Sequence, residues 1–366
     1  MVNRLENELF ESVKTLDDLG KDFTLEESLL IVSGADSREK LEKYKNRIGY
    51  LHKKYQNRLV KKDSCSKTRT LVKFVGNGKK RFRGREGDIS NDYLTNVINR
   101  KIWRHKIGNC LGLSELAAVV GLREGLDLGC LLFPGHISLF LKNGAERINL
   151  ETTIKSGFNF KYGNSKESKE EDSLLTEERI EVLLPVLLGD RGYLSYNLKD
   201  LDKAIDLFQD SDFYRWRGIL FEENGKISEA IENYKKSIQI KPYHKSYFNL
   251  GSLLLEKNKL DEALENFNKC ILKCPTHPLA LIDRGVVHSK KGNYEKAVND
   301  FIKAKNFGLK DHKINAHFNL GSVYKDMGEY KEALREFKKY STYNEENERE
   351  VEKRIVYLTR KISLDN

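Results

Sequence analysis

Three residues in the first half of the chain have the types that activate a thiol for covalent chemistry, namely Cys110, His136 and Glu151. Cys110 follows Gly108-Asn109 and begins a predicted helix, so unpaired backbone N–H groups would lie behind the sulfur. Such groups favour a thiolate and can also serve as an oxyanion hole. In this chemistry the sulfur attacks an acyl carbon, the histidine moves the proton and the carboxylate orients the histidine.

A hairpin signal predicts how His136 is placed. Asn143-Gly144 is the kind of dipeptide that most strongly favours a two-residue type I′ loop. The register set by that loop places His136 opposite Glu151. Directly opposed residues hold their Cβ atoms about 4.5–5.5 Å apart. The sequence therefore predicts that the imidazole and the carboxylate are neighbours on paired strands.

The elements that would position these residues combine helices with strands. Apolar residues recur at helical spacing in Leu25–Leu59, with one break, and further helices are predicted at Asp92–Lys101 and Leu111–Gly121. The segments LDLGCLLF and HISLFLKNGAERINLET are predicted as strands. Cys130 lies on the first of them, where a structural thiol is expected. The predicted fold class of this half is α+β.

Three segments carry a family resemblance: GNCLGLSELA, PGHISLFL and INLETT resemble the motifs of the bacterial transglutaminase-like core, a papain-like cysteine fold. The resemblance spans about Leu25–Thr153, with the specific motifs in Asn91–Thr153. It implies that Cys110 is the nucleophile, His136 the base and Glu151 the orienting acid. Many relatives carry aspartate where this chain has Glu151, which keeps the chemistry but loosens the geometric match.

Three further residues are candidates for the oxyanion hole or the cleft of such a core. Asn91 falls where these proteins often carry an asparagine before the helix, Asn109 directly precedes the cysteine, and Trp103 lies a short way ahead of it. For Trp103 a packing role is an equal alternative. No cofactor and no metal site are expected. Hydrolysis and cross-linking pass through the same thioester, so the sequence leaves both open.

The second half of the chain contains a repeat with fixed internal spacing. Four glycines are separated by steps of 33, 34 and 36 residues. An alanine follows each glycine by 12 residues, and an aromatic residue follows each alanine by 4. The four triplets are Gly218, Ala230 and Tyr234; Gly251, Ala263 and Phe267; Gly285, Ala297 and Phe301; and Gly321, Ala333 and Phe337.

This pattern resembles tetratricopeptide repeats over about Ser211–Tyr343 and predicts an all-α solenoid with two helices per unit. A small residue stands where the two helices cross closely, and the aromatic residue is expected to fill the groove against the next hairpin. Gly192, Ala204 and Phe208 keep the same spacing and predict a degenerate earlier unit. Glu346–Ile362 is predicted to be a capping helix.

Arrays of this family bind extended peptides or helices on a concave face. Asn249 and Asn319 occupy positions where such repeats often hydrogen-bond a ligand backbone, so they are the predicted peptide-binding residues. The alternative is that FNLG is only the commonest form of this turn. Leu279 and Asp283 fall where the chaperone-tail clamp of this family needs cations, so that ligand is not indicated. Cys270 is predicted to be a core cysteine and not a metal ligand.

Composition and charge narrow the class of protein further. Five cysteines, an odd number, argue for a reducing compartment, and no secretory or membrane-length apolar run is present, so a cytoplasmic protein is expected. The net charge of +10 is concentrated in Lys53–Glu86, which holds 13 Lys and Arg against two acids. A basic run invites a nucleic-acid hypothesis. It matches no signature of that class, so a solvated, partly flexible face is favoured.

The predicted organisation has four parts: a helical lead-in with the basic segment at 1–90, a transglutaminase-like core at 91–162, a polar linker at 163–176 and tetratricopeptide repeats at 177–362. The first function hypothesis is a cysteine-dependent acyl-transfer enzyme (peptidase, amidase or transglutaminase) whose repeats recruit a protein substrate or partner. The second is a non-catalytic adaptor with a vestigial core. The third is a nucleic-acid-associated scaffold.

Overall fold

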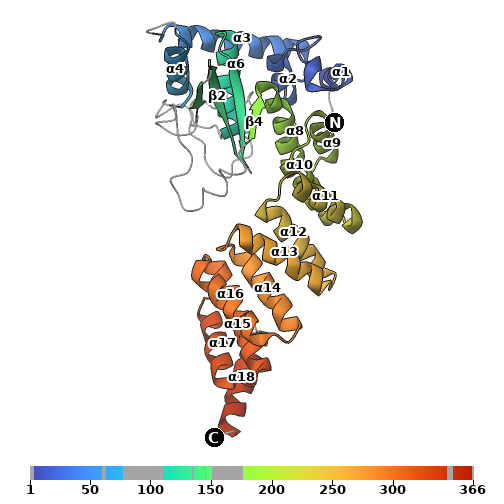
Figure 1. Cartoon of the computed structure of the whole chain (residues 1–366), viewed down its shortest axis with the longest axis vertical. Coiled ribbons are helices and arrows are strands. Elements are labelled where there is room, and N and C mark those ends of the chain that lie inside the picture. Colours follow the sequence, from blue (N-terminus) through green and yellow to red (C-terminus); the bar gives the residue numbers. More distant parts are fainter. Residues whose placement is uncertain are drawn as a thin grey trace. The chain divides into compact units, whose positions relative to one another are not determined.

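The computed structural model describes residues 4–59, 63–76, 110–133, 136–144, 146–150, 176–343 and 349–364 (Figure 1). Contacts divide the chain into two compact units, Met1–Asn224 and Gly225–Asn366. The boundary between the units falls inside the predicted repeat region, and the predicted boundaries at 90, 162 and 176 stay predictions. None of the described helices is long and apolar enough to cross a membrane.

The helices of the first unit begin where the sequence supplies capping residues. Thr24 caps the second helix: its hydroxyl accepts a hydrogen bond from the Glu27 N–H at 3.2 Å, and the Glu27 carboxylate accepts one from the Thr24 N–H at 3.0 Å. The predicted helical stretch with one break is confirmed as α2 and α3. The described helices of this unit are α1 (Arg4–Ser12), α2 (Leu25–Val32), α3 (Arg38–Gln56), α4 (Ser64–Gly76), α6 (Cys110–Arg123), α8 (Leu183–Leu194), α9 (Leu198–Leu207) and α10 (Ser211–Glu223).

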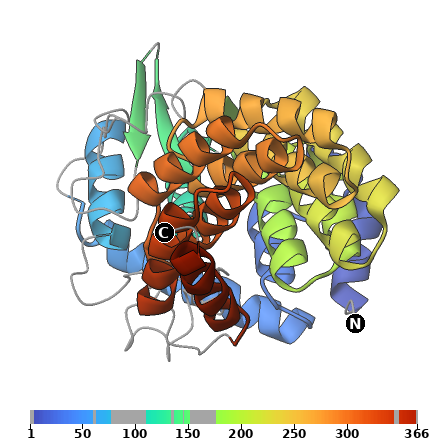
Figure 2. The same cartoon turned by 90° about the horizontal axis from the view of Figure 1, so that it is seen from below.

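A four-stranded antiparallel sheet completes the first unit, with the strand order β3-β2-β1-β4. The strands β1 and β2 pair from Phe133 opposite His136 to Leu128 opposite Leu141. The pair β2 and β3 is visible as two adjacent green arrows in Figure 2. The strands are β1 (Leu128–Phe133), β2 (His136–Asn143), β3 (Glu146–Leu150) and β4 (Thr176–Arg179).

The register of β2 and β3 differs from the predicted one by two residues. Asn143 pairs with Glu146, so the two-residue loop begins at Gly144 and not at Asn143. Gly144 has a φ of +62°, the positive value that two-residue hairpin loops require. The predicted register would have placed the buried Leu141 opposite Glu146, whereas the observed register pairs Leu141 with Ile148. Because the side-chain period of a strand is two, the same faces still point to the core.

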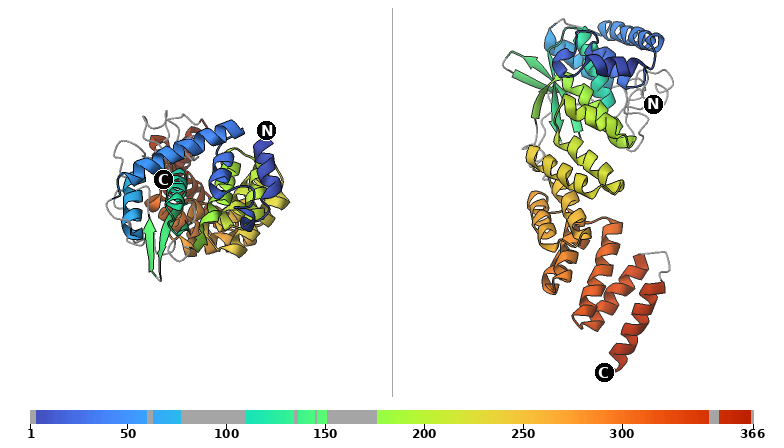
Figure 3. Two further views of the ribbon diagram at one scale, coloured as in Figure 1. Left: turned by 90° about the horizontal axis from the view of Figure 1, so that it is seen from above. Right: turned by 90° about the vertical axis from the view of Figure 1, so that its right-hand side faces the viewer.

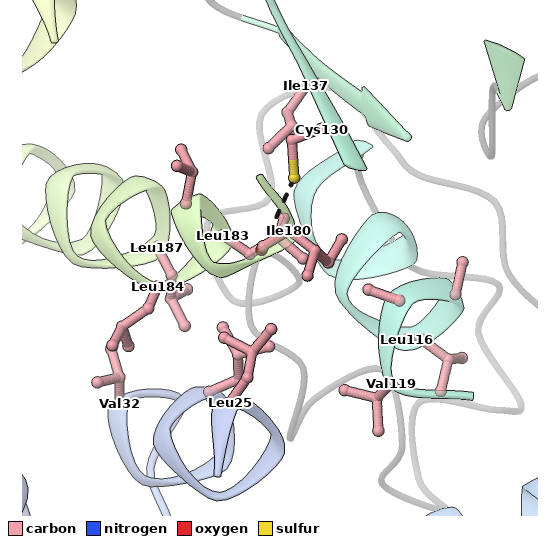
Figure 4. Packing of buried hydrophobic residues seen from close by; sticks show 14 of the residues in the cluster. Leu25, Val32, Leu116, Val119, Cys130, Ile137, Ile180, Leu183, Leu184 and Leu187 are labelled. Carbon is pink, nitrogen blue, oxygen red and sulfur yellow. Dashed lines mark hydrogen bonds between the residues drawn. The ribbon is translucent and has the colours of Figure 1, made fainter. Parts of the chain in front are cut away.

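One apolar core joins the helices and the sheet of the first unit. Each fully buried large apolar side chain contributes about 1.5–3 kcal/mol relative to an exposed one. The core draws residues from α2, α6, the sheet and α8, so segments far apart in sequence are fixed against one another. Figure 4 shows part of it, including Leu25, Val32, Leu116, Val119, Cys130, Ile137, Ile180, Leu183, Leu184 and Leu187.

Part of the basic run folds into a packed helix. Leu71, Val72 and Val75 of α4 are buried, and α4 packs against α6. Residues 64–76 therefore form a packed helix, because apolar residues at helical spacing alternate there with the cations, and the exposed Arg69 is compatible with the predicted solvated face. Residues 60–62 and 77–86 of the run lie outside the described residues.

The second unit begins with α11, the second helix of the first repeat, and continues as successive helical hairpins, which Figure 3 shows following one another in yellow, orange and red. Each hairpin is a first helix and a second helix of the predicted repeat, and the predicted capping helix is confirmed as the last element. Its residues Val351 and Leu358 are buried against the last hairpin. The helices are α11 (Ile227–Ile240), α12 (His244–Glu256), α13 (Leu260–Lys273), α14 (Pro278–Lys290), α15 (Tyr294–Phe307), α16 (Lys310–Asp326), α17 (Tyr330–Tyr343) and α18 (Arg349–Leu364).

The glycine and the aromatic residue of one hairpin face each other. A Cβ atom added to Gly251 would lie 2.8 Å from a ring carbon of Phe267. Gly285 and Phe301 repeat this arrangement in the next hairpin, at 2.6 Å. The ring therefore packs on the glycine of its own hairpin, and Phe301 also clusters with Leu320 and Val323 of the next hairpin, as expected. The small residue is needed where the ring approaches the backbone.

A second periodic feature, not predicted from the sequence, lies in the turn between the two helices of each hairpin. The residue 7 positions after each repeat glycine has a positive φ. Glycine adopts this conformation freely, and asparagine is among the residues that tolerate it best. The residues are Gly225 (+72°), Asn258 (+56°), Gly292 (+73°) and Gly328 (+80°).

The predicted degenerate unit is a helical hairpin of different packing, made by α8 and α9. Gly192 and Ala204 are buried. However, the nearest side chain to a Cβ atom at Gly192 is Leu201, at 2.9 Å. Phe208 lies beyond the end of α9 in an extended conformation. This unit therefore keeps the spacing of the later repeats, but a contact between Gly192 and Leu201 replaces their glycine–aromatic contact.

The hairpins of the second unit curve toward their first helices. Contacts between consecutive first helices, α12 with α14 and α14 with α16, are more extensive than contacts between consecutive second helices such as α13 and α15. First helices therefore lie closer together than second helices do. In a solenoid this difference makes the first-helix side the concave one.

Candidate functional site

Two of the three predicted catalytic residues stand at the first residues of elements that are in contact. Cys110 is the first residue of α6, and His136 is the first residue of β2. α6 packs against β2. The predicted helix start at Cys110 is thus confirmed for the backbone. Glu151, one residue beyond the end of β3, lies outside the described residues, as do Asn91, Trp103 and Asn109.

The observed register changes the argument for a pairing of His136 with Glu151. That pairing was derived from a loop at Asn143, and the loop begins one residue later. The strands therefore do not place the two residues directly opposite each other by register. The role of Glu151 stays an implication of the family resemblance alone.

Charged groups fix the end of α6 that lies away from Cys110. The Arg123 guanidinium donates to the Glu26 carboxylate of α2 through Nε at 2.7 Å and Nη2 at 2.5 Å. It also donates to the Lys45 carbonyl of α3 at 3.3 Å. A bidentate pair of this kind fixes orientation as well as distance. The helix that begins at Cys110 is therefore held on a rigid support.

Glu124, directly after α6, joins three elements. Its carboxylate lies 2.8 Å from His52 Nε2 of α3 and 3.1 Å from Lys67 Nζ of α4. It also accepts a hydrogen bond from Gln56 at 3.1 Å. Burial raises the pKa of Glu124, but the hydrogen bonds from His52 and Lys67 lower it further, so its pKa lies below the usual range. Lys67 belongs to the basic run, so one of those cations serves the fold.

Cys130 and Cys270 are buried core cysteines, as the sequence predicts. Cys130 is fully buried on β1, and its thiol lies 3.8 Å from the Ile180 carbonyl. Burial raises the pKa of this thiol well above its usual range. Cys270 is fully buried in α13. Among the described residues, no group of three or more His, Cys, Asp or Glu side chains is placed to hold a metal ion.

The first helices of the array carry the predicted peptide-binding residues. Asn249 lies on α12 and Asn319 on α16, each two residues before the repeat glycine, and both are half-buried. Asp283 holds the same position on α14 and is also half-buried. Its carboxylate accepts a hydrogen bond from the Ser252 hydroxyl of α12 at 2.9 Å. One polar side chain per repeat therefore lies on the first-helix side.

Comparison with solved structures finds chains of low sequence identity and low structural similarity. The crystal structure of MamA protein is 20% identical with a TM-score of 0.40, covering 45% of this chain and 92% of that chain. MamA from Desulfovibrio magneticus RS-1 is 18% identical with a TM-score of 0.40, over 44% and 94% of the two chains. YrrB, described as a TPR protein with an unusual peptide-binding site, is 17% identical with a TM-score of 0.41, over 50% and 91%.

The comparison with protein-family models is more specific than the comparison with solved structures. No curated protein matches the chain. The family model described as "Tetratricopeptide repeat" matches residues 211–244, 244–272 and 314–347. It leaves out the hairpin of α14 and α15, although Gly285 and Phe301 pack there as Gly251 and Phe267 do in a matched repeat. The family match and the hairpin geometry together identify these repeats as tetratricopeptide repeats, a class whose members bind protein or peptide partners.

Proposed function

We propose that this chain is a protein-interaction adaptor whose repeat array binds an extended protein segment. The observation that carries the proposal is the first-helix side of α12, α14 and α16, where consecutive helices adjoin and carry one polar side chain per repeat. The amides of Asn249 and Asn319 can each donate to a peptide carbonyl and accept from a peptide N–H. Such hydrogen bonds bind the backbone of the peptide and do not depend on its side chains.

The test is a binding measurement with fluorescein-labelled decapeptides of randomised sequence, followed by fluorescence anisotropy. The double variant Asn249→Ala and Asn319→Ala should weaken binding about tenfold or more, since each lost hydrogen bond contributes about 1 kcal/mol. The matched control is Asn299→Ala with Asn306→Ala, two exposed asparagines of the second helix α15. That control should bind like the wild-type chain. Equal binding by both double variants would show that the first-helix side is not the binding surface.

A second candidate function is cysteine-dependent acyl transfer in the first unit. It is favoured by the start of α6 at Cys110 and by the packing of α6 against β2, which starts at His136. Under this proposal the unit is a transglutaminase-like core, with Glu151 orienting the histidine, and the array recruits the substrate. If the core is vestigial, the adaptor function remains. The rate at which Cys110 is alkylated distinguishes the two.

A further inference from the structure

One position of the array carries a charge in only one of three hairpins. Asn249, Asp283 and Asn319 all lie two residues before the repeat glycine, on α12, α14 and α16. Asparagine at two of these positions shows that the hairpin packs well with a neutral side chain of the same shape. The negative charge of Asp283 is therefore not required by the repeat geometry.

The surroundings of Asp283 do not compensate its charge. The Ser252 hydroxyl donates one hydrogen bond to Oδ2 at 2.9 Å. Among residues 225–343 and 349–364, no Lys, Arg or His forms an ion pair with this carboxylate. Burial raises the pKa of Asp283, and the hydrogen bond from Ser252 opposes that rise. A half-buried carboxylate without a cation is costly, because burying a charge destabilises the fold unless the charge is paired.

The helix that carries Asp283 also offers apolar surface beside it. Leu279 lies one turn before Asp283 and Val286 one turn after it, and residues at these spacings share a helix face. Leu279 is 38% exposed, so part of its side chain is accessible beside Asp283. A long side chain with an aliphatic stem and a cationic head matches this combination of apolar and acidic groups.

We infer that Asp283 is the specificity-determining residue of the array and that it binds a lysine or arginine side chain of the partner segment. The inference rests on the proposed binding function and adds the chemistry of the partner. The cation would pair with the Asp283 carboxylate on the concave side, while its stem covers Leu279 and Val286. An acidic partner is disfavoured, because a second carboxylate would be repelled at this position.

The experiment compares four pools of fluorescein-labelled decapeptides with the full chain by fluorescence anisotropy. The central residue is fixed as lysine, arginine, norleucine or glutamate, and the other positions are randomised. The lysine and arginine pools should bind about tenfold more tightly than the norleucine pool, with the glutamate pool weakest. Asp283→Asn should remove this preference, so that the lysine, arginine and norleucine pools bind this variant with about equal affinity. The variant should fold, because asparagine is the natural residue at the same position of two other repeats.

Asp326→Asn is the matched control, because Asp326 is an exposed carboxylate at the end of α16 whose nearest cation is Lys325, at 3.5 Å. This variant should keep the full preference for basic pools. If the four pools bind the wild-type chain equally, or if Asp283→Asn retains the preference, Asp283 does not select the partner, although the array still binds peptides. If no pool binds, the proposed binding function and this inference both fail.

Discussion

Replacing Gly251 with tryptophan is expected to destabilise the second unit by about 3 kcal/mol. The added side chain would have to pass the ring of Phe267, a carbon of which lies only 2.8 Å from an ideal Cβ position. Phe267 is fully buried, so the ring cannot move aside without opening the hairpin. Urea unfolding of the full chain, followed by circular dichroism at 222 nm, measures the loss.

The matched control for this variant is Glu256→Trp, which places the same side chain at an exposed position of the same helix. It should unfold like the wild-type chain. Gly251→Ala should give an intermediate loss, since a single methyl group already meets the Phe267 ring. Equal unfolding midpoints for Gly251→Trp and Glu256→Trp would mean that the assigned packing of glycine on the aromatic ring is wrong.

Alkylation of Cys110 by iodoacetamide at pH 6 is expected to be on the order of 100-fold faster than alkylation of Cys130 or Cys270, if the acyl-transfer proposal holds. A helix N-terminus and a nearby imidazolium favour the reactive thiolate, whereas Cys130 and Cys270 are fully buried. His136→Ala should slow the labelling of Cys110 markedly. Glu151→Gln should slow it less, because it misorients the ring without deleting it. Mass spectrometry of peptide digests gives the rate for each thiol.

If the chain is an adaptor with a vestigial core, we expect a different rate of Cys110 alkylation. Cys110 is then alkylated no faster than Cys274, which is half-buried. Cys110→Ala should leave peptide binding by the array unchanged under both proposals. Slow labelling would therefore remove the catalytic proposal and leave the binding function intact.

The repeats were predictable from the sequence because their causes are local. A glycine such as Gly251 and its aromatic partner Phe267 lie in one hairpin, so their spacing is fixed by two helices and one turn. The residue with positive φ in the turn between the two helices has a sequence signal as well, since a glycine or Asn258 recurs at that position. The contact of the ring with the glycine of its own hairpin was not predicted, because spacing alone does not say which glycine the ring meets.

The sheet was predicted only in part because its pairing depends on distant segments. β4, with the sequence TEER, has no apolar alternation and is a strand because it pairs with β1. Gly129 of β1 permits this pairing, since a Cβ atom there would lie 2.9 Å from the Glu178 carbonyl oxygen. The hairpin of β2 and β3 was recognised, but a loop at Gly144 and a loop at Asn143 both fit the local signal. Burial of Leu141 opposite Ile148 decided between them.

Charged networks in the first unit had no signal in the sequence. Arg191 of α8 forms a bidentate pair with Asp200 of α9 at 2.6 and 2.7 Å, and it also contacts Glu6 of α1 at 2.5 Å. The same guanidinium donates to the Val32 carbonyl at 2.9 Å. The helices α1 and α2 thus meet the distant pair α8 and α9 at this one side chain. A pairing of this kind follows from the fold and cannot be read from spacing.

The most direct test of the adaptor proposal is to map where a bound peptide touches the array. The lysine-centred decapeptide pool, carrying a diazirine at its N-terminus, is irradiated with the full chain, and the cross-linked residues are identified by mass spectrometry. We expect cross-links on α12, α14 and α16, and their loss in the Asn249→Ala, Asn319→Ala variant. Cross-links confined to the second helices α13, α15 and α17, or to the first unit, would contradict the proposal.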